Sequence, residues 1–144
     1  MAQTTQQALA KLLADTYTLY LKTQNYHWHV RGPNFRSLHL LFEEQYTSLA
    51  LAVDAIAERI VTLGGQAPAS FKEYLGLASI HEGEAHTNAE TMVSNLAKDH
   101  RQVIKDMNTV IKLAQEQGDE GTIALLSERI AEHEKICWML EASR

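Results

Sequence analysis

The chain has 144 residues, 45% of them hydrophobic, and a formal net charge of −5. This length suits one domain with a single core, and the negative charge disfavours direct attraction to nucleic-acid phosphates while favouring metal cations. Cys137 is the only cysteine, which excludes an internal disulfide and a thiolate zinc cluster and fits a reducing compartment.

The start of the chain shows no targeting signal. Residues 1–7 are polar and lack the basic-then-apolar pattern of a signal peptide. The longest apolar runs, such as residues 49–53, are only a few residues long, far short of a membrane span. The sequence therefore predicts a soluble, cytoplasmic protein without a membrane partner.

Two long helices are predicted in the first half. Apolar and threonine side chains recur at intervals of three and four from about residue 4 to residue 30. Gly32 and Pro33 interrupt this pattern, and a second helix is predicted from about residue 34 to 63, ending at Gly64 and Gly65. Its main apolar stripe comprises Phe35, Leu38, Phe42, Leu49, Val53, Ile56 and Ile60.

A long crossover and two further helices are predicted next. The helical period fades over residues 66–88, within which Phe71 to Leu77 can form a short helix. A helix is expected over 89–117, and another after Gly118, where Asp119 and Glu120 suit a helix start. Their predicted core residues are Met92, Leu96, Val103, Met107, Val110 and Ala114, then Ile123, Leu126, Ile130, Cys137 and Leu140. Four long helices with one long crossover indicate an all-α, ferritin-like four-helix bundle formed by residues 1–144.

Residues 25–59 place acids and histidines among apolar residues, which is costly unless a metal compensates. On the second helix His39, Glu43, Asp54 and Glu58 share one stripe. The His39/Glu43 and Asp54/Glu58 pairs are about 16 Å apart along the helix, so one centre cannot use both pairs from one chain. An antiparallel second copy would bring the pairs together, and a tight hairpin would add His27.

These residues resemble the signature of the Dps miniferritins. The resemblance is carried by His27-Trp28, residues 32–35, Leu38-His39, residues 42–46, Asp54 and residues 56–59, with the spacing His-x11-His-x3-acid-x10-Asp-x3-Glu. It implies a ferroxidase centre at a dimer interface, with His27, His39 and Glu43 from one chain and Asp54 and Glu58 from the other. It also implies that Trp28 is an ancillary electron donor. Many relatives have Asp in place of Glu43 and Asn in place of His29, so His29 is either a further ligand or a helix cap.

The resemblance also implies a function. Members oxidise Fe(II) with hydrogen peroxide or dioxygen, at up to two iron positions per centre, and mineralise Fe(III) inside a dodecameric cage that protects against oxidative stress. It places Asp119 and Glu120 at an iron-entry pore, although Ala124 replaces an acid found in relatives. Larger ferritins use Glu-x-x-His within one bundle. That motif does not occur here, which favours the shared centre.

The alternative function is a DNA-compacting, nucleoid-associated protein with little iron chemistry. Relatives that bind DNA directly carry a basic terminal extension, and neutralising phosphates requires several cations. This chain has only Lys11 near its start and Arg144 at its end, so DNA binding is doubtful.

Each candidate residue also has a structural interpretation. His27 can cap a helix end, Glu43 can belong to a solvated face, Asp54 can pair with Arg59 or Arg31, Glu58 can form a salt bridge, and Trp28 can pack in the core. Outside this stretch, His133 is expected to be a hydrogen-bonded core residue and His100 to lie on a helix surface. His81 and His86 in the crossover are expected to have no role.

Overall fold

The computed structural model describes residues 3–84 and 86–144 and contains five helices and no strand over those ranges. The helices are α1 (Thr5–His29), α2 (Phe35–Thr62), α3 (Phe71–Leu77), α4 (Ala89–Glu116) and α5 (Glu120–Ala142). The all-α prediction is confirmed, and the ends predicted for α1 to α4 agree to within one residue. Over the same ranges, none of the helices combines the length and apolar character needed to cross a membrane.

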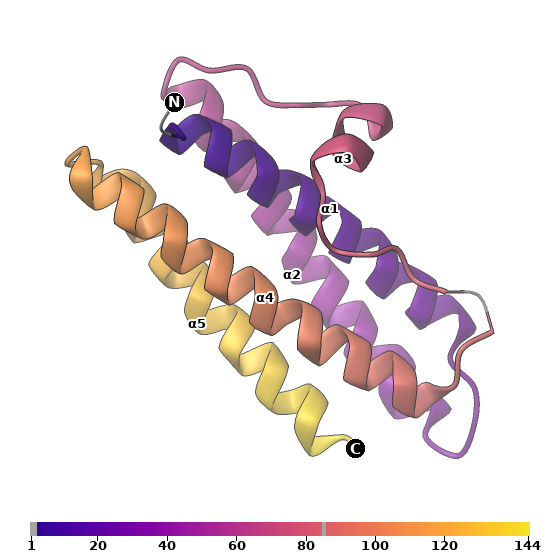
Figure 1. Ribbon diagram of the computed structural model, residues 1–144. Coiled ribbons are helices and arrows are strands. Elements are labelled where there is room, and N and C mark those ends of the chain that lie inside the picture. Colours follow the sequence, from indigo (N-terminus) through magenta and orange to yellow (C-terminus); the bar gives the residue numbers. More distant parts are fainter. Residues whose placement is uncertain (1–2, 85) are drawn as a thin grey trace.

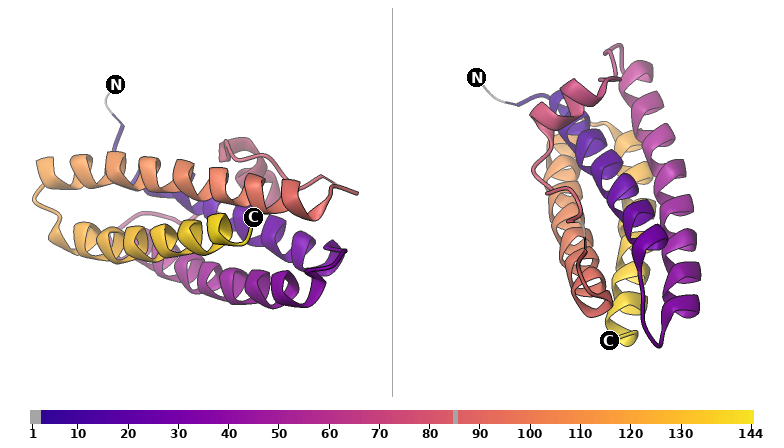
Figure 2. Two further views of the ribbon diagram at one scale, coloured as in Figure 1. Left: turned by 90° about the horizontal axis from the view of Figure 1, so that it is seen from below. Right: turned by 90° about the vertical axis from the view of Figure 1, so that its right-hand side faces the viewer.

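The helices form two antiparallel pairs, α1 with α2 and α4 with α5 (Figures 1 and 2). The crossover returns along α1 and carries the short α3. As a result α2 and α5 run in opposite directions, and the α1–α2 turn lies at the end of the bundle where the C-terminus is found (Figure 1).

Helix starts are fixed by side chains that accept from otherwise unpaired backbone N–H groups. Thr4 and Gln7 form a reciprocal capping box before α1. Ser70, Asn88 and Asp119 cap α3, α4 and α5. Such caps typically contribute about 1 kcal/mol each, so they help to define where these four helices begin, whereas Asn34 makes no such side-chain bond at the start of α2.

The core lies between the two pairs. All six predicted core residues of α4 are buried, and on α5 Leu126 and Leu140 are buried while the other three are half-buried. On α2 the predicted apolar stripe is buried or half-buried except at Phe35, which is 43% exposed. Phe35 stacks instead on the His39 ring, with centroids 5.1 Å apart, because it occupies the first turn of α2 beyond the reach of the core.

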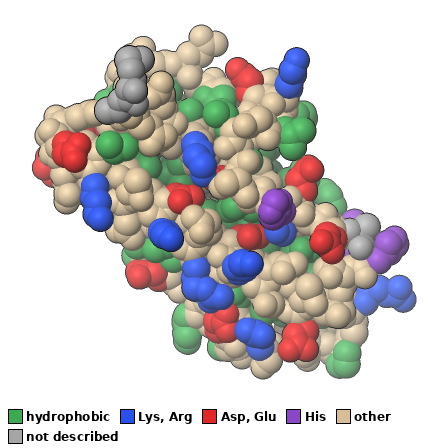
Figure 3. Space-filling model, in the orientation of Figure 1, with side chains coloured by type: hydrophobic (Ala, Val, Ile, Leu, Met, Phe, Trp, Pro, Cys, Tyr) green, Lys and Arg blue, Asp and Glu red, His purple; other side chains and the backbone are tan. Residues whose placement is uncertain are grey.

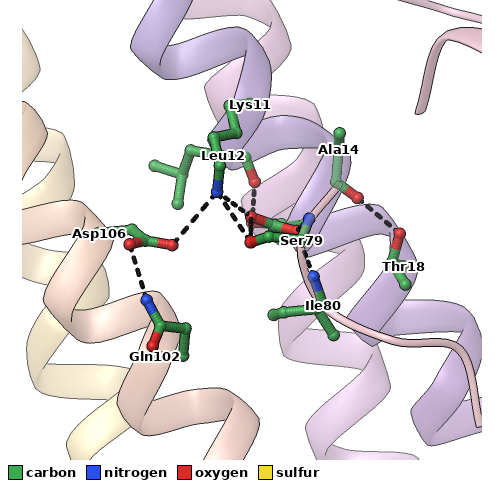
Figure 4. Close-up of polar contacts among 10 residues, drawn as sticks. Lys11, Leu12, Ala14, Thr18, Ser79, Ile80, Gln102 and Asp106 are labelled. Atoms are coloured by element: carbon green, nitrogen blue, oxygen red, sulfur yellow. Dashed lines mark hydrogen bonds and ion pairs between the residues drawn. The ribbon is translucent and has the colours of Figure 1, made fainter. Parts of the chain in front are cut away.

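Asp15 ties the crossover to α1 where Figure 4 shows Ser79 and Ile80 of the crossover beside Lys11 of α1. This fully buried carboxylate accepts hydrogen bonds from the Ser79 and Ile80 backbone amides, at 2.6 and 2.9 Å, and from Lys11 Nζ at 2.8 Å. Lys11 Nζ also lies 3.6 Å from Asp106 of α4. A buried carboxylate is tolerated only when its oxygens are satisfied in this way, so Asp15 holds the crossover at a fixed height along α1.

Candidate metal centre

The α1–α2 turn brings His27 and His39 together. Helix α1 ends where Val30 adopts an extended conformation. Gly32 then has a φ of +120°, which residues other than glycine rarely adopt. The Phe35 amide donates to the Gly32 carbonyl and starts α2 at once. The chain reverses so tightly that the last turn of α1 faces the first turns of α2.

The two histidines hold each other through backbone carbonyls. His27 Nδ1 donates to the carbonyl of His39, and His39 Nδ1 donates to the carbonyl of His27, both at 2.7 Å. The rings stack with centroids 3.8 Å apart and planes within 11°. Because a carbonyl oxygen can only accept, each Nδ1 carries the hydrogen, which leaves Nε2 as the nitrogen that can bind a metal. A hydrogen bond of this kind orients a metal-binding imidazole.

Glu43 brings a carboxylate close to the two imidazoles. It lies one turn after His39, and its Oε1 is 3.8 Å from His27 Nε2. Among the described residues, His27, His39 and Glu43 offer ligand atoms that all lie within 4.8 Å of one another. His27 is buried, His39 half-buried and the Glu43 side chain 52% exposed, so the cluster opens to the outside of the bundle. Two imidazoles and one carboxylate with open positions are a donor set typical of non-haem Fe(II).

Asp54 and Glu58 lie further along α2 and do not join this cluster. Both are exposed in the single chain, so the burial cost assumed from the sequence does not arise there. Pairing of Asp54 with Arg59 does not occur either, because the Arg59 guanidinium lies 2.6 Å from Asp119. The same helix exposes Leu40, Leu51 and Val61, so acids and large apolar side chains share an uncovered surface.

The residues beside the cluster have different surroundings. Trp28 is 58% exposed and meets the His29 ring edge-on at 6.5 Å, so the core-packing interpretation is wrong in the single chain. His29 Nδ1 donates to the backbone carbonyl and side-chain oxygen of Asn25, which caps the last turn of α1.

Sequence reasoning assigned no role to Tyr46, whose ring meets the His27 ring edge-on with centroids 5.2 Å apart. A signal was available, because Tyr46 follows His39 by seven residues and Glu43 by three and therefore shares their helix face.

Asp119 and Glu120 stand at the start of α5. Asp119 accepts from the Thr122 amide and hydroxyl and from Arg59. Burial alone would raise the pKa of Asp119, but these Thr122 and Arg59 contacts outweigh it and hold the pKa below its usual range. Gly121 permits the contact, since a Cβ there would lie 2.6 Å from an Arg59 nitrogen. Glu120 is exposed, so the two acids differ in surroundings.

His100 is fully buried, which corrects its expected place on a helix surface. Its Nδ1 lies 2.9 Å from His133 Nδ1, and His133 Nε2 lies 3.2 Å from an Arg129 nitrogen. Burial, with a smaller effect of Arg129, lowers the pKa of His100 to about 3. His133 is a hydrogen-bonded core residue, as predicted, and burial lowers its pKa as well.

Acidification should therefore destabilise the fold through His100. Between its ordinary pKa of 6.5 and about 3, the unfolded chain binds a proton at His100 and the folded chain does not. Stability contributed by the neutral ring is lost as pH falls, by up to about 1.4 kcal/mol per pH unit. Thermal unfolding followed by circular dichroism between about pH 7 and pH 5 measures this slope. His100→Gln should give a shallower slope than wild type, and identical slopes would contradict the assignment.

Comparisons with known proteins identify the family of this chain. A model of the ferritin-like domain matches residues 6–143. The chain is 42% identical over 136 residues to DNA protection during starvation protein 2 of Bacillus anthracis, covering 94% of this chain and 93% of that protein.

Solved structures of Dps proteins share the whole fold. The Dps protein of Vibrio cholerae O1, described as a member of a broad superfamily of ferritin-like diiron-carboxylate proteins, superposes with a TM-score of 0.93 at 40% identity, covering 96% of this chain and 87% of that one. A Dps protein from Bacillus brevis gives a TM-score of 0.93 at 37% identity, covering 99% and 98%. The chain therefore belongs to the ferritin-like family and, within it, to the Dps proteins.

Proposed function

We propose that this chain is a ferroxidase subunit of a homo-oligomeric cage, a dodecamer built from two-fold dimers, that oxidises Fe(II) and stores Fe(III) inside. The observation that carries the proposal is the mutual hydrogen bonding of His27 and His39 through Nδ1, which leaves both Nε2 atoms available, with the ligand atoms of the two histidines and Glu43 within 4.8 Å of one another. Three donors leave open coordination positions at the outer face of the cluster, where an oxidant and further ligands can enter.

A second copy of the chain completes the centre in this proposal. The α2 helix of a two-fold-related copy runs antiparallel to the first α2. Its Asp54 and Glu58 supply two more carboxylates beside His39 and Glu43. The large apolar side chains exposed on α2 support an interface there, because such side chains gain stability when another surface covers them. Two-fold symmetry then generates two equivalent centres in each dimer.

The residues have distinct tasks in this chemistry. The imidazoles bind Fe(II) through neutral nitrogen, and the carboxylates stabilise the extra positive charge that appears as Fe(II) becomes Fe(III). With hydrogen peroxide, two Fe(II) supply both electrons, two protons are taken up, and the products are two Fe(III) and two waters. Trp28, the neighbour of His27 in the sequence, acts as an ancillary electron donor. Asp119 and Glu120 form the iron-entry pore, with Glu120 carrying the more accessible charge because Asp119 is bound to Arg59.

Direct binding of DNA is not part of this proposal. On the face formed by α1 and α4, Lys and Arg side chains are interspersed with Asp and Glu (Figure 3). Neighbouring acids weaken the attraction of such cations for phosphates.

Iron titration tests the proposal. Fe(II) added to the purified protein, followed by hydrogen peroxide, should be oxidised far faster than in buffer, with one peroxide consumed for every two Fe(II). Stopped-flow absorbance of Fe(III) and a peroxide assay provide both readouts. An oxidation rate equal to that of buffer would refute the ferroxidase assignment.

A further inference from the structure

A row of aromatic rings leads away from the candidate metal centre. Tyr46 of α2 meets His27 edge-on at 5.2 Å and Tyr20 at 6.0 Å. Tyr20 meets Tyr17 at 5.8 Å, and Tyr17 stacks on Tyr74 of α3 at 4.9 Å. Each ring in the row thus lies beside the next, from the centre to the crossover.

Helix geometry explains why the row needs Tyr46. His27 and Tyr20 are seven residues apart on α1, which separates them by about 10.5 Å along the axis. Tyr46 comes from the neighbouring helix and fills this gap. Tyr17 and Tyr20 are three residues apart and lie on the same face of α1, where Tyr74 packs from α3.

The composition of the row suits electron transfer. Beyond His27, its members are phenols, which are more readily oxidised than aliphatic side chains or phenylalanine. All four tyrosines are half-buried, so a phenol that loses an electron can release its proton to water. Tyr26, also on α1, is fully buried and contacts Phe42 and Asn95 instead of the row.

We propose that Tyr46, Tyr20, Tyr17 and Tyr74 form a one-electron path to the iron centre, used when a centre holds a single Fe(II). This inference rests on the proposed function. Reduction of hydrogen peroxide to water takes two electrons, and a lone Fe(II) gives only one. The phenol gives the other: Fe(II), TyrOH, hydrogen peroxide and one proton become Fe(III), a neutral tyrosyl radical and two waters. The radical passes along the row, away from the centre.

Electron paramagnetic resonance tests the path in assembled protein loaded with one Fe(II) per centre and mixed with hydrogen peroxide. All variants are made in a Trp28→Phe background, so that an indole radical does not mask the signal. The parent should show a tyrosyl radical, and Tyr46→Phe should lower its yield at least tenfold. Tyr20→Phe should confine the radical to Tyr46, which changes its hyperfine pattern.

Tyr26→Phe is the matched control and should leave the radical yield unchanged. Phenylalanine keeps the ring packing at each position, and size-exclusion chromatography verifies assembly. A radical yield unaffected by Tyr46→Phe overturns the path. So does the absence of any tyrosyl radical in a parent that rapidly oxidises two Fe(II) per centre. Failure of that parent to oxidise Fe(II) under any loading indicates instead that the ferroxidase proposal itself is wrong.

Discussion

His39→Ala is expected to slow the rapid oxidation of Fe(II) by roughly 100-fold or more. Removing a residue that only hydrogen-bonds to a metal ligand already lowers metal affinity or activity by about 10–100-fold, and here a ligand itself is removed. The substitution removes one Nε2 donor from a cluster of three. It leaves the backbone carbonyl of residue 39, which accepts from His27 Nδ1, so His27 keeps the hydrogen bond that orients it. Stopped-flow absorbance at two Fe(II) per centre measures the rate.

Glu44→Ala is the matched control. Glu44 is exposed, adjacent to Glu43, and absent from the cluster of ligand atoms, so its removal changes a side chain on the same helix without removing a ligand atom. We expect its oxidation rate to match wild type, and both variants to elute as assembled protein from a size-exclusion column. A wild-type rate in His39→Ala would eliminate His39 as an iron ligand.

Co-assembly of two inactive chains should restore activity. When His39→Ala and Asp54→Ala chains pair, one of the two centres loses both ligands while the other receives intact His39 and intact Asp54. Random pairing makes half of the dimers mixed, so about a quarter of the wild-type centres should become active. Each chain alone forms only defective centres.

Co-expression with two different affinity tags, followed by sequential purification, yields the mixed assemblies. Their rate of Fe(II) oxidation is compared with that of each parent at equal protein concentration. A centre built within one chain predicts no recovery, because every chain then carries a damaged site. Recovery therefore distinguishes a shared centre from an internal one.

The sequence predicts the part of the candidate centre formed by His27, His39 and Glu43, because local features of the chain bring these residues together. Gly32 and Pro33 reverse the chain, and the helical period places Glu43 one turn after His39. The mutual hydrogen bonds of His27 and His39 could not be predicted, since they depend on the exact separation of two backbones rather than on residue types. In the proposed dimer, the surroundings of Asp54 and Glu58 depend on a second chain, which helical periodicity in one chain does not determine.

His100 shows how a residue type misled the prediction. It follows Leu96 by four residues and precedes Val103 by three, which places it on the buried stripe of α4. Periodicity alone therefore indicated burial, while the polarity of histidine favoured the surface. Burial occurs because His133 offers His100 a polar partner inside the bundle and is itself bonded to Arg129, and both of those residues come from a helix distant in sequence.

The clamped imidazole pair has a thermodynamic corollary. Because folding has already immobilised both rings, a cation that binds them has little further ordering cost. Under the proposed arrangement, the facing chain adds the remaining ligands and so contributes to the affinity. Cation uptake and subunit pairing are then linked equilibria: whatever tightens one must tighten the other by the same factor. Under the proposed arrangement, a low iron concentration would weaken subunit association, and a low protein concentration would weaken iron binding. Loading with iron would stabilise the cage.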